Sequence, residues 1–163
     1  MARAAGEVLG ALGTPRVVVN NAGIVRRGVT VDATSAANWD EVIGVNLRGP
    51  FLVSRAFLPS MLREKRGRLV HVASISSTIG SPGAASYAAS KWGLVGLAKS
   101  LAEELRGKGL QSIAVLPGSV DTEMLVGSGF EPRMSADDVA GLIVYAGLDA
   151  PDALSGSAVE MFG

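Results

Sequence analysis

The sequence predicts an α/β protein with a mainly parallel sheet of about four strands, and three observations support this fold class. Short apolar runs such as Val17–Val19 show no alternation with polar residues, which is typical of strands covered on both faces. Long stretches of helical character separate these runs. Polar or glycine-rich turns follow the runs, where open parallel sheets hold their ligands. We expect one domain over residues 1–163, because no linker, repeat or low-complexity tract interrupts the pattern.

The first half of the chain predicts a helix, a strand and a long helix. The opening helix ends where glycine precedes proline at Gly13 and Pro15, a common stop signal. Ser35 is a suitable N-cap for the long helix, which we expect to kink at Gly49-Pro50 and at Pro59. The expected elements are a helix over residues 2–12, a strand over 16–20, a loop over 23–34 and a helix over 36–64.

The second half predicts strands that alternate with helices. The helix that carries Trp92 ends at Gly107 and Gly109, because glycine readily adopts the left-handed conformation that closes a helix. Ser135 and Asp138 have the spacing of a capping box at the start of the last helix. The expected elements are strands over residues 68–73, 111–116 and 157–162, loops over 74–83 and 122–132, and helices over 84–106 and from 135 to near 147.

Composition limits the possible functions. The 15 basic and 15 acidic residues give a formal net charge of zero, so no overall field attracts nucleic acid or an anionic membrane. We interpret the cluster Arg63, Lys65, Arg66 and Arg68 as a solvated helix end. There is no cysteine and one histidine, His71, which we expect to be structural, so we predict no metal site. No apolar run reaches the ~20 residues that span a bilayer, and no signal peptide is recognisable, so we expect a cytoplasmic protein.

Tyr87 and Lys91 form the most informative motif of the chain. Their spacing places the phenol and the ammonium on one face of a helix. A neighbouring cation favours the phenolate, so we expect Tyr87 to exchange protons closer to neutral pH than a free phenol, whose pKa is about 10. Ser74, at the end of the preceding strand, is placed to polarise a substrate oxygen. The pair alone is common on helix surfaces, so its surroundings decide the assignment.

These surroundings carry a family resemblance. Asn20-Asn21-Ala22-Gly23 follows the first strand, Asn46 lies in a helix, Ser74 precedes Tyr87 and Lys91, and Pro117-Gly118-Ser119-Val120-Asp121-Thr122 follows a later strand. In these residues, and in their order, the chain resembles the short-chain dehydrogenase/reductase family. The resemblance runs from about residue 2 to the C-terminus. It implies a Rossmann-like, three-layer, doubly wound parallel sheet, of which this chain holds the C-terminal two-thirds.

The resemblance also implies a function and a set of site residues. The reaction would be NAD(P)-linked reduction of a ketone or oxidation of a secondary alcohol. Tyr87 would be the general acid or base, Lys91 would lower its pKa, Ser74 would position the reacting oxygen, and Asn46 would support a proton-relaying water. The implied cofactor contacts are Asn21, Ala22, Gly23, Tyr87, Lys91, Pro117, Gly118, Val120 and Thr122. Neither the substrate nor the choice between NAD and NADP is evident from these residues.

One part that the resemblance implies is missing from the sequence. Members of the family begin with a strand and a Gly-rich turn that hold the cofactor pyrophosphate. The nearest spacing, Gly6, Gly10 and Gly13, precedes the first expected strand and lies in a helix and its C-cap. We therefore expect residues 1–163 alone to bind NAD(H) and NADP(H) weakly or not at all. A real loss, a misassigned start codon and a cloning boundary remain open as explanations.

Two hypotheses about function remain open at this point. The first is an NAD(P)-dependent oxidoreductase acting on a small alcohol or ketone, and the second is a non-catalytic remnant that serves as a subunit-interaction module. The two long helices carry more apolar residues than one sheet face covers, so we expect a homodimer or homotetramer through them, and the first strand would present an unpaired edge. We interpret Trp39 and Trp92 as core or interface residues, and Gly93 and Gly96 as packing contacts.

Overall fold

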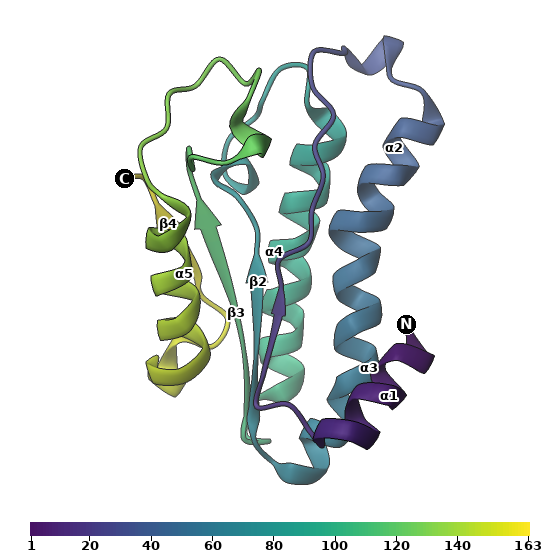
Figure 1. Ribbon diagram of the computed structural model, residues 1–163, viewed down its shortest axis with the longest axis vertical. Coiled ribbons are helices and arrows are strands. Elements are labelled where there is room, and N and C mark those ends of the chain that lie inside the picture. Colours follow the sequence, from purple (N-terminus) through teal and green to yellow (C-terminus); the bar gives the residue numbers. More distant parts are fainter.

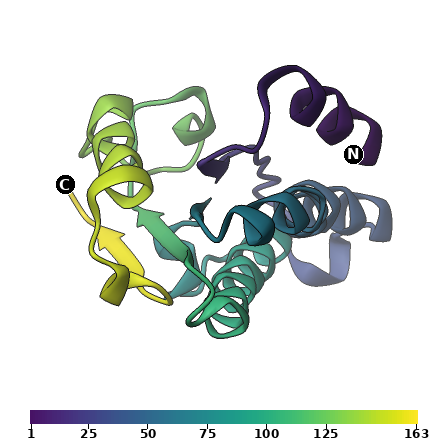
Figure 2. The same cartoon turned by 90° about the horizontal axis from the view of Figure 1, so that it is seen from below.

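The computed structural model describes all 163 residues, and it shows a parallel sheet between layers of helices (Figures 1 and 2). The strands lie side by side in the order in which they occur along the chain, and every neighbouring pair is parallel. The predicted α/β fold with four parallel strands is therefore confirmed. The strands are β1 (Val17–Asn20), β2 (Gly67–Val72), β3 (Leu110–Pro117) and β4 (Ala158–Met161).

The helices follow the predicted order with one interruption. The long helix expected over residues 36–64 is divided by a π-helical turn just before Gly49 and Pro50, whereas Pro59 lies inside the helix without ending it. The α-helices are α1 (Ala2–Leu12), α2 (Ala36–Ile43), α3 (Gly49–Glu64), α4 (Ala85–Leu105) and α5 (Ala136–Val144). The π-helical turns are η2 (Gly44–Arg48) and η5 (Tyr145–Asp149). The 3-10 turns are η1 (Val31–Ala33), η3 (Ile75–Ser77), η4 (Glu123–Leu125) and η6 (Asp152–Leu154).

Each face of the sheet has its own apolar core. Met61 of α3 and Leu101 of α4 pack with Val18 and Leu69 on one face. On the other face, Val70 and its strand neighbours pack against the α5–η5 segment. Figure 2 shows α3 and α4 together on one side of the sheet and α5 on the other. Because both faces are covered, the central strands carry apolar residues without alternation, as the sequence predicts.

Local capping fixes where two of these helices begin. The Ser35 hydroxyl accepts a hydrogen bond from the Asn38 backbone N–H (3.2 Å), as predicted for an N-cap. Ser135 and Asp138 form the predicted capping box, in which each side chain accepts a hydrogen bond from the other residue's backbone N–H. Such caps satisfy N–H groups that have no partner within the helix.

Two glycines are required by close packing, and one predicted contact is absent. A Cβ on Gly109 would lie 2.0 Å from the Lys65 carbonyl oxygen, and its φ of +77° also disfavours other residues. A Cβ on Gly93 would lie 2.8 Å from Leu47 Cδ2, so α4 approaches η2 closely there. A Cβ built on Gly96 would have no heavy atom within 4 Å and the residue is exposed, so the fold of this chain shows no packing contact that requires glycine there.

One edge of the sheet is open at β1. The strand pairs with β2 alone, and its Val19 side chain is 42% exposed. The short α1 contacts α3 and buries only Ala5, while Leu12 at its end is 83% exposed. The predicted unpaired edge is therefore present in the fold.

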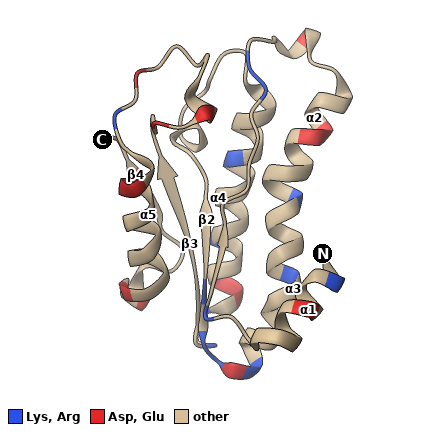
Figure 3. Ribbon diagram, viewed as in Figure 1, with Lys and Arg blue, Asp and Glu red and all other residues tan.

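The basic cluster is not a single helix end. Lys65 is the left-handed C-cap of α3, but Arg68 lies on β2, where its guanidinium donates a hydrogen bond to the Ala146 carbonyl (3.1 Å) and pairs with Asp152. Arg68 and Arg66 border a polar hollow of about 200 Å³ at the amino ends of the strands, opposite the edge where the predicted site residues lie. Figure 3 shows basic residues gathered where α3 leads into β2, with acidic and basic residues mixed elsewhere. None of the helices has the length and apolar character needed to cross a lipid bilayer.

Candidate active site

The predicted site residues gather at one edge of the sheet because of its topology. Asn21-Ala22-Gly23 follows β1, Ser74 follows β2, and the segment from Gly118 to Thr122 follows β3. In a parallel sheet the carboxyl ends of neighbouring strands share one edge, which is where open α/β sheets bind ligands. The η3 turn that Ser74 caps packs against α4, whose first two turns carry Tyr87 and Lys91.

Tyr87 is buried at the start of α4. Its ring packs with Val42 of α2 and with Ile24 and Val25 of the segment after β1, which leaves 8% of the residue exposed. Burial raises the pKa of the phenol, while the Ser74 hydroxyl and the charge of Arg27 act to lower it. The net effect raises the pKa of Tyr87, whereas the sequence predicts a lowered pKa. The loss of water around the buried phenol outweighs the effects of Ser74 and Arg27.

Lys91 lies beneath Tyr87 as a buried cation. Its Nζ is 5.7 Å from the centroid of the Tyr87 ring and donates a hydrogen bond to the Val72 carbonyl (2.8 Å). The residue is 3% exposed and no carboxylate pairs with it, so burial lowers the pKa of its amine to about 8. An ammonium has three N–H donors, so those not bonded to Val72 can bind a ligand.

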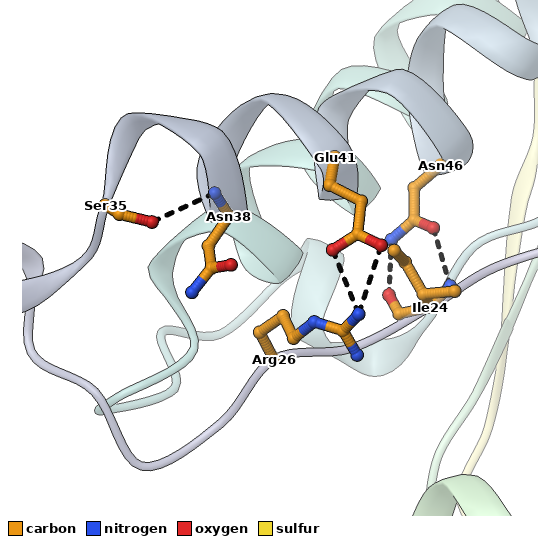
Figure 4. Close-up of polar contacts among 6 residues, drawn as sticks. All are labelled: Ile24, Arg26, Ser35, Asn38, Glu41 and Asn46. Carbon is orange, nitrogen blue, oxygen red and sulfur yellow. Dashed lines mark hydrogen bonds and ion pairs between the residues drawn. The ribbon is translucent and has the colours of Figure 1, made fainter.

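Asn46 lies in the π-helical turn η2, and its side chain forms hydrogen bonds to the segment after β1 and to α4. Its Oδ1 accepts a hydrogen bond from the Ile24 N–H, and its Nδ2 donates to the Ile24 carbonyl, both at 2.8 Å (Figure 4). Its Nδ2 also donates to Ser90 Oγ (3.0 Å), and Ser90 in turn donates to the Tyr87 carbonyl (2.7 Å). Asn46 thus holds the segment after β1 against the first turn of α4. Single π-helical turns often occur at functional sites.

Gly23 brings backbone close to the polar centre. A Cβ at this position would lie 3.4 Å from both Asn46 Oδ1 and Lys91 Nζ. Gly23 therefore lies close to Asn46 and Lys91, whereas the neighbouring Asn21 and Ala22 are exposed. This position agrees with the predicted close approach of backbone to a cofactor, which glycine permits.

Ser74 keeps a donor for a ligand. Its Oγ accepts a hydrogen bond from the Ser76 backbone N–H (3.1 Å), which orients the hydroxyl at the end of β2. A hydroxyl has one O–H donor in addition to its acceptor capacity, so Ser74 can still donate to a substrate oxygen.

Part of the segment after β3 is held in place by hydrogen bonds within the fold. The Gly118 N–H donates to the Met161 carbonyl of β4 (2.9 Å), so it is already occupied and the predicted cofactor contact through this N–H is not available. Val120 bridges to Met134, and Thr122 is exposed. Pro117, the last residue of β3, is buried. The cofactor contacts expected of Pro117, Gly118, Val120 and Thr122 stay predictions, with the N–H of Gly118 already used within the fold.

His71 is buried beside this site and is structural, as the sequence predicts. Asn20 Nδ2 lies 3.2 Å from its Nδ1, and burial lowers the pKa of the imidazole to about 4, so it is neutral near pH 7.

Sequence reasoning overlooked two residues of this region. Ser90 links Asn46 to Tyr87, and its position three residues after Tyr87 on the same helix face was an available signal. Arg27 acts on Tyr87 through its charge, which only the three-dimensional proximity reveals.

The fold and the site together define a class of protein, an α/β protein with a Rossmann-like parallel sheet and a buried Tyr-Lys pair at the carboxyl edge of its strands. Comparison with known proteins agrees with this class. A model of the short chain dehydrogenase family matches residues 1–130. The chain belongs to the short-chain dehydrogenase/reductase family.

Individual relatives extend the comparison. A 3-oxoacyl-acyl-carrier-protein reductase from Thermotoga maritima is 34% identical over 159 residues, which cover 90% of this chain and 64% of the relative. A short chain dehydrogenase from Monascus ruber is 38% identical over 156 residues, covering 89% of this chain and 50% of the relative. The crystal structure of a gluconate 5-dehydrogenase from Burkholderia cenocepacia J2315, in complex with NADP and tartrate, gives a TM-score of 0.93 at 26% identity and covers 99% of this chain and 69% of that chain. This chain thus spans between half and about two thirds of the length of these relatives.

The residues present fit one half of a nicotinamide dinucleotide. The unpaired N–H donors of buried Lys91 and the close backbone of Gly23 suit the ribose beside the nicotinamide. The pyrophosphate half is not matched, because α1 precedes β1 and no Gly-rich turn links a strand to a helix N-terminus before it. The residues of this chain therefore fit the nicotinamide end of such a cofactor and not its pyrophosphate.

Proposed function

We propose that this chain provides the proton-transfer centre of an NAD(P)-linked oxidoreductase that interconverts a ketone and a secondary alcohol. The observation that carries the proposal is the buried Lys91 ammonium, held by Val72 directly under Tyr87 and without a carboxylate partner. Burying a cation without a partner is costly, and such perturbed groups concentrate at functional sites. The match to reductases does not favour the non-catalytic alternative.

Reduction needs a hydride at carbon and a proton at oxygen. A bound nicotinamide supplies the hydride. The Tyr87 phenol donates the proton to the developing alkoxide, so the carbonyl becomes a carbinol and Tyr87 becomes a phenolate. The Ser74 hydroxyl donates a hydrogen bond to the same oxygen and stabilises the charge that develops there. The raised pKa of Tyr87 keeps its proton at neutral pH, which supports the direction of reduction.

Lys91 and Asn46 organise the proton donor. The cation of Lys91 stabilises the phenolate left after proton transfer, and its free N–H donors bind ribose hydroxyls. Asn46 holds Ile24 and Ser90 in place, and Ser90 fixes the carbonyl of Tyr87 itself. A water that donates a hydrogen bond to Asn46 Oδ1 would relay a proton to Lys91, and Lys91 would return a proton to the phenolate and restore the phenol. The test is ketone-dependent oxidation of NADH or NADPH, followed by absorbance of the reduced nicotinamide over a panel of ketones.

Dinucleotide affinity of residues 1–163 alone should be weak. The nicotinamide-proximal contacts remain, but no helix N-terminus in the matching position offsets the pyrophosphate charge. Calorimetric titration with NADH and NADPH is expected to give no saturable heat at micromolar concentrations. A micromolar dissociation constant for either nucleotide would show that another part of the chain binds the pyrophosphate.

We infer that two copies associate through the outer surfaces of α3 and α4. Phe51 on α3 and Trp92 on α4 are 45% and 54% exposed, and both helices cover the same face of the sheet (Figure 2). Large exposed aromatic side chains are enriched at interfaces. The double substitution Phe51→Glu and Trp92→Glu should convert the dimer to a monomer in sedimentation velocity. Leu148→Glu, on η5 at the opposite face of the sheet, is the matched control and should leave the dimer intact. A dimer that survives the double substitution would contradict this interface.

A further inference from the structure

The segment after β1 carries two consecutive arginines with different surroundings. The Arg26 guanidinium donates hydrogen bonds to both carboxylate oxygens of Glu41 at 3.1 and 2.9 Å (Figure 4). Arg27 pairs with no carboxylate, and its Nη1 donates to the Met124 carbonyl at 2.5 Å. The charge of Arg26 is therefore neutralised within the fold, whereas the charge of Arg27 is not.

Arg27 lies in the segment after β1, at the carboxyl edge of the sheet where the predicted site residues gather. Its hydrogen bond to Met124, in the η4 turn, joins the segment after β1 to the segment after β3 across 97 residues of sequence. Ile24 and Val25, just before Arg27 in the same segment, pack against the cluster that contains Tyr87, so Arg27 lies two residues from a contact with the proposed proton donor. The side chain is half-buried, and one of its five N–H donors is occupied by Met124. The remaining four donors have no partner within the fold and can bind a ligand.

We propose that Arg27 binds the carboxylate of an anionic substrate, so that the substrate class is a hydroxy acid or the corresponding oxo acid. This inference rests on the proposed function and specifies the substrate of the same site. The planar guanidinium can donate two parallel hydrogen bonds to a carboxylate. This pairing would orient the substrate so that the carbonyl oxygen of the substrate accepts hydrogen bonds from Tyr87 and Ser74. A neutral ketone would leave the Arg27 charge unmatched and would gain nothing from it.

A purely structural function for Arg27 makes a different prediction. If Arg27 only fastened η4 to the segment after β1, then Arg27→Gln, which keeps an N–H donor for the Met124 carbonyl, would preserve the behaviour of the site. If the positive charge binds the substrate, the same substitution removes the preference for an anion. Arg26→Gln is the matched control, because it removes a neighbouring guanidinium whose charge Glu41 already neutralises.

The experiment is an NMR titration of D-gluconate and of neutral D-glucitol into the wild-type chain and both variants. Gluconate carries hydroxylated carbons at successive distances from its carboxylate, so it samples several spacings between Arg27 and Tyr87 in one ligand. We expect gluconate to bind about tenfold more tightly than glucitol, as for a hydrogen bond to a charged group. Arg27→Gln should abolish this preference, and Arg26→Gln should retain it.

The titration needs neither cofactor nor turnover, so it separates this inference from the proposed function. Equal binding of gluconate and glucitol by the wild type, or an unchanged preference in Arg27→Gln, would overturn the assignment of Arg27. A preference that depends on Arg27 supports it even if no ketone is reduced, and in that case only the proposed oxidoreductase activity fails.

Discussion

Replacing Tyr87 with phenylalanine should lower kcat by about 100-fold or more when a segment that binds the pyrophosphate is joined to residues 1–163, while cofactor affinity stays close to that of the same protein with Tyr87. The substitution removes the proton donor and keeps the buried ring that packs with Val42. General acid catalysis typically contributes at least this factor. Lys91 retains its hydrogen bond to Val72 and its free donors, so the contacts proposed for the ribose are unaffected. The measurement is steady-state kinetics together with a cofactor titration.

Two further variants make this result specific. Tyr145→Phe changes the only other tyrosine, which is exposed on η5, and it should leave kcat unchanged. Lys91→Ala should reduce both turnover and cofactor affinity, because it removes the cation beneath the phenol and the ribose contacts together. A Tyr87→Phe variant that keeps more than about a tenth of wild-type kcat would rule out Tyr87 as the general acid.

Replacing Lys91 with methionine should stabilise the fold even though it damages the site. Methionine keeps the apolar stem in the buried position and removes the charge that has no partner. The pKa of Lys91 falls from 10.5 to about 8 on folding, so burying the protonated amine opposes folding. At about 1.4 kcal/mol per pKa unit, and after the loss of the Val72 hydrogen bond, the gain in the free energy of unfolding at pH 7 should be about 1–3 kcal/mol.

The pH dependence checks the cause of this stabilisation. Between pH 8 and pH 10.5 the unfolded chain binds more protons at Lys91 than the folded chain, so wild-type stability rises with pH in this window. The advantage of Lys91→Met should be complete below about pH 8 and should disappear toward pH 10.5. Urea denaturation at several pH values measures it. Lys99→Met is the control, since Lys99 lies exposed on the same helix and also donates to a carbonyl, that of Gly156. An equal gain from Lys99→Met would show that the buried charge is not responsible.

Sequence periodicity was sufficient to predict the layers of this fold. The consecutive valines of β1 indicate a strand, although the exposed Val19 shows that this edge strand is not covered on both faces, and the capping box at Ser135 marks the start of α5. Strand bounds differ from the expected ones by one residue, because pairing with a neighbour decides where a short strand ends. The interruption of the long helix was expected at Gly49-Pro50, but its form as a π-helical turn depends on the bonds of Asn46 to Ile24 and Ser90.

The electrostatics of the site could not be predicted from the sequence. The spacing of Tyr87 and Lys91 indicates that the two side chains share a helix face, but it does not reveal how deeply both are buried. Burial determines the direction of both pKa shifts, so the phenol is harder to ionise than expected and the amine is easier to neutralise. The difference between Arg26 and Arg27 likewise depends on which residue Glu41 reaches.

The strand order of the sheet has a consequence for how the protein forms on the ribosome. Each strand pairs with the strand that precedes it in the chain, from β1 to β4. During synthesis from the N-terminus, every new strand therefore finds its partner already made, and no strand waits for a distant later segment. The sheet can grow by one crossover at a time while translation continues. Of these four strands β1 is made first, and within residues 1–163 the edge that faces away from β2 gains no partner from any later strand.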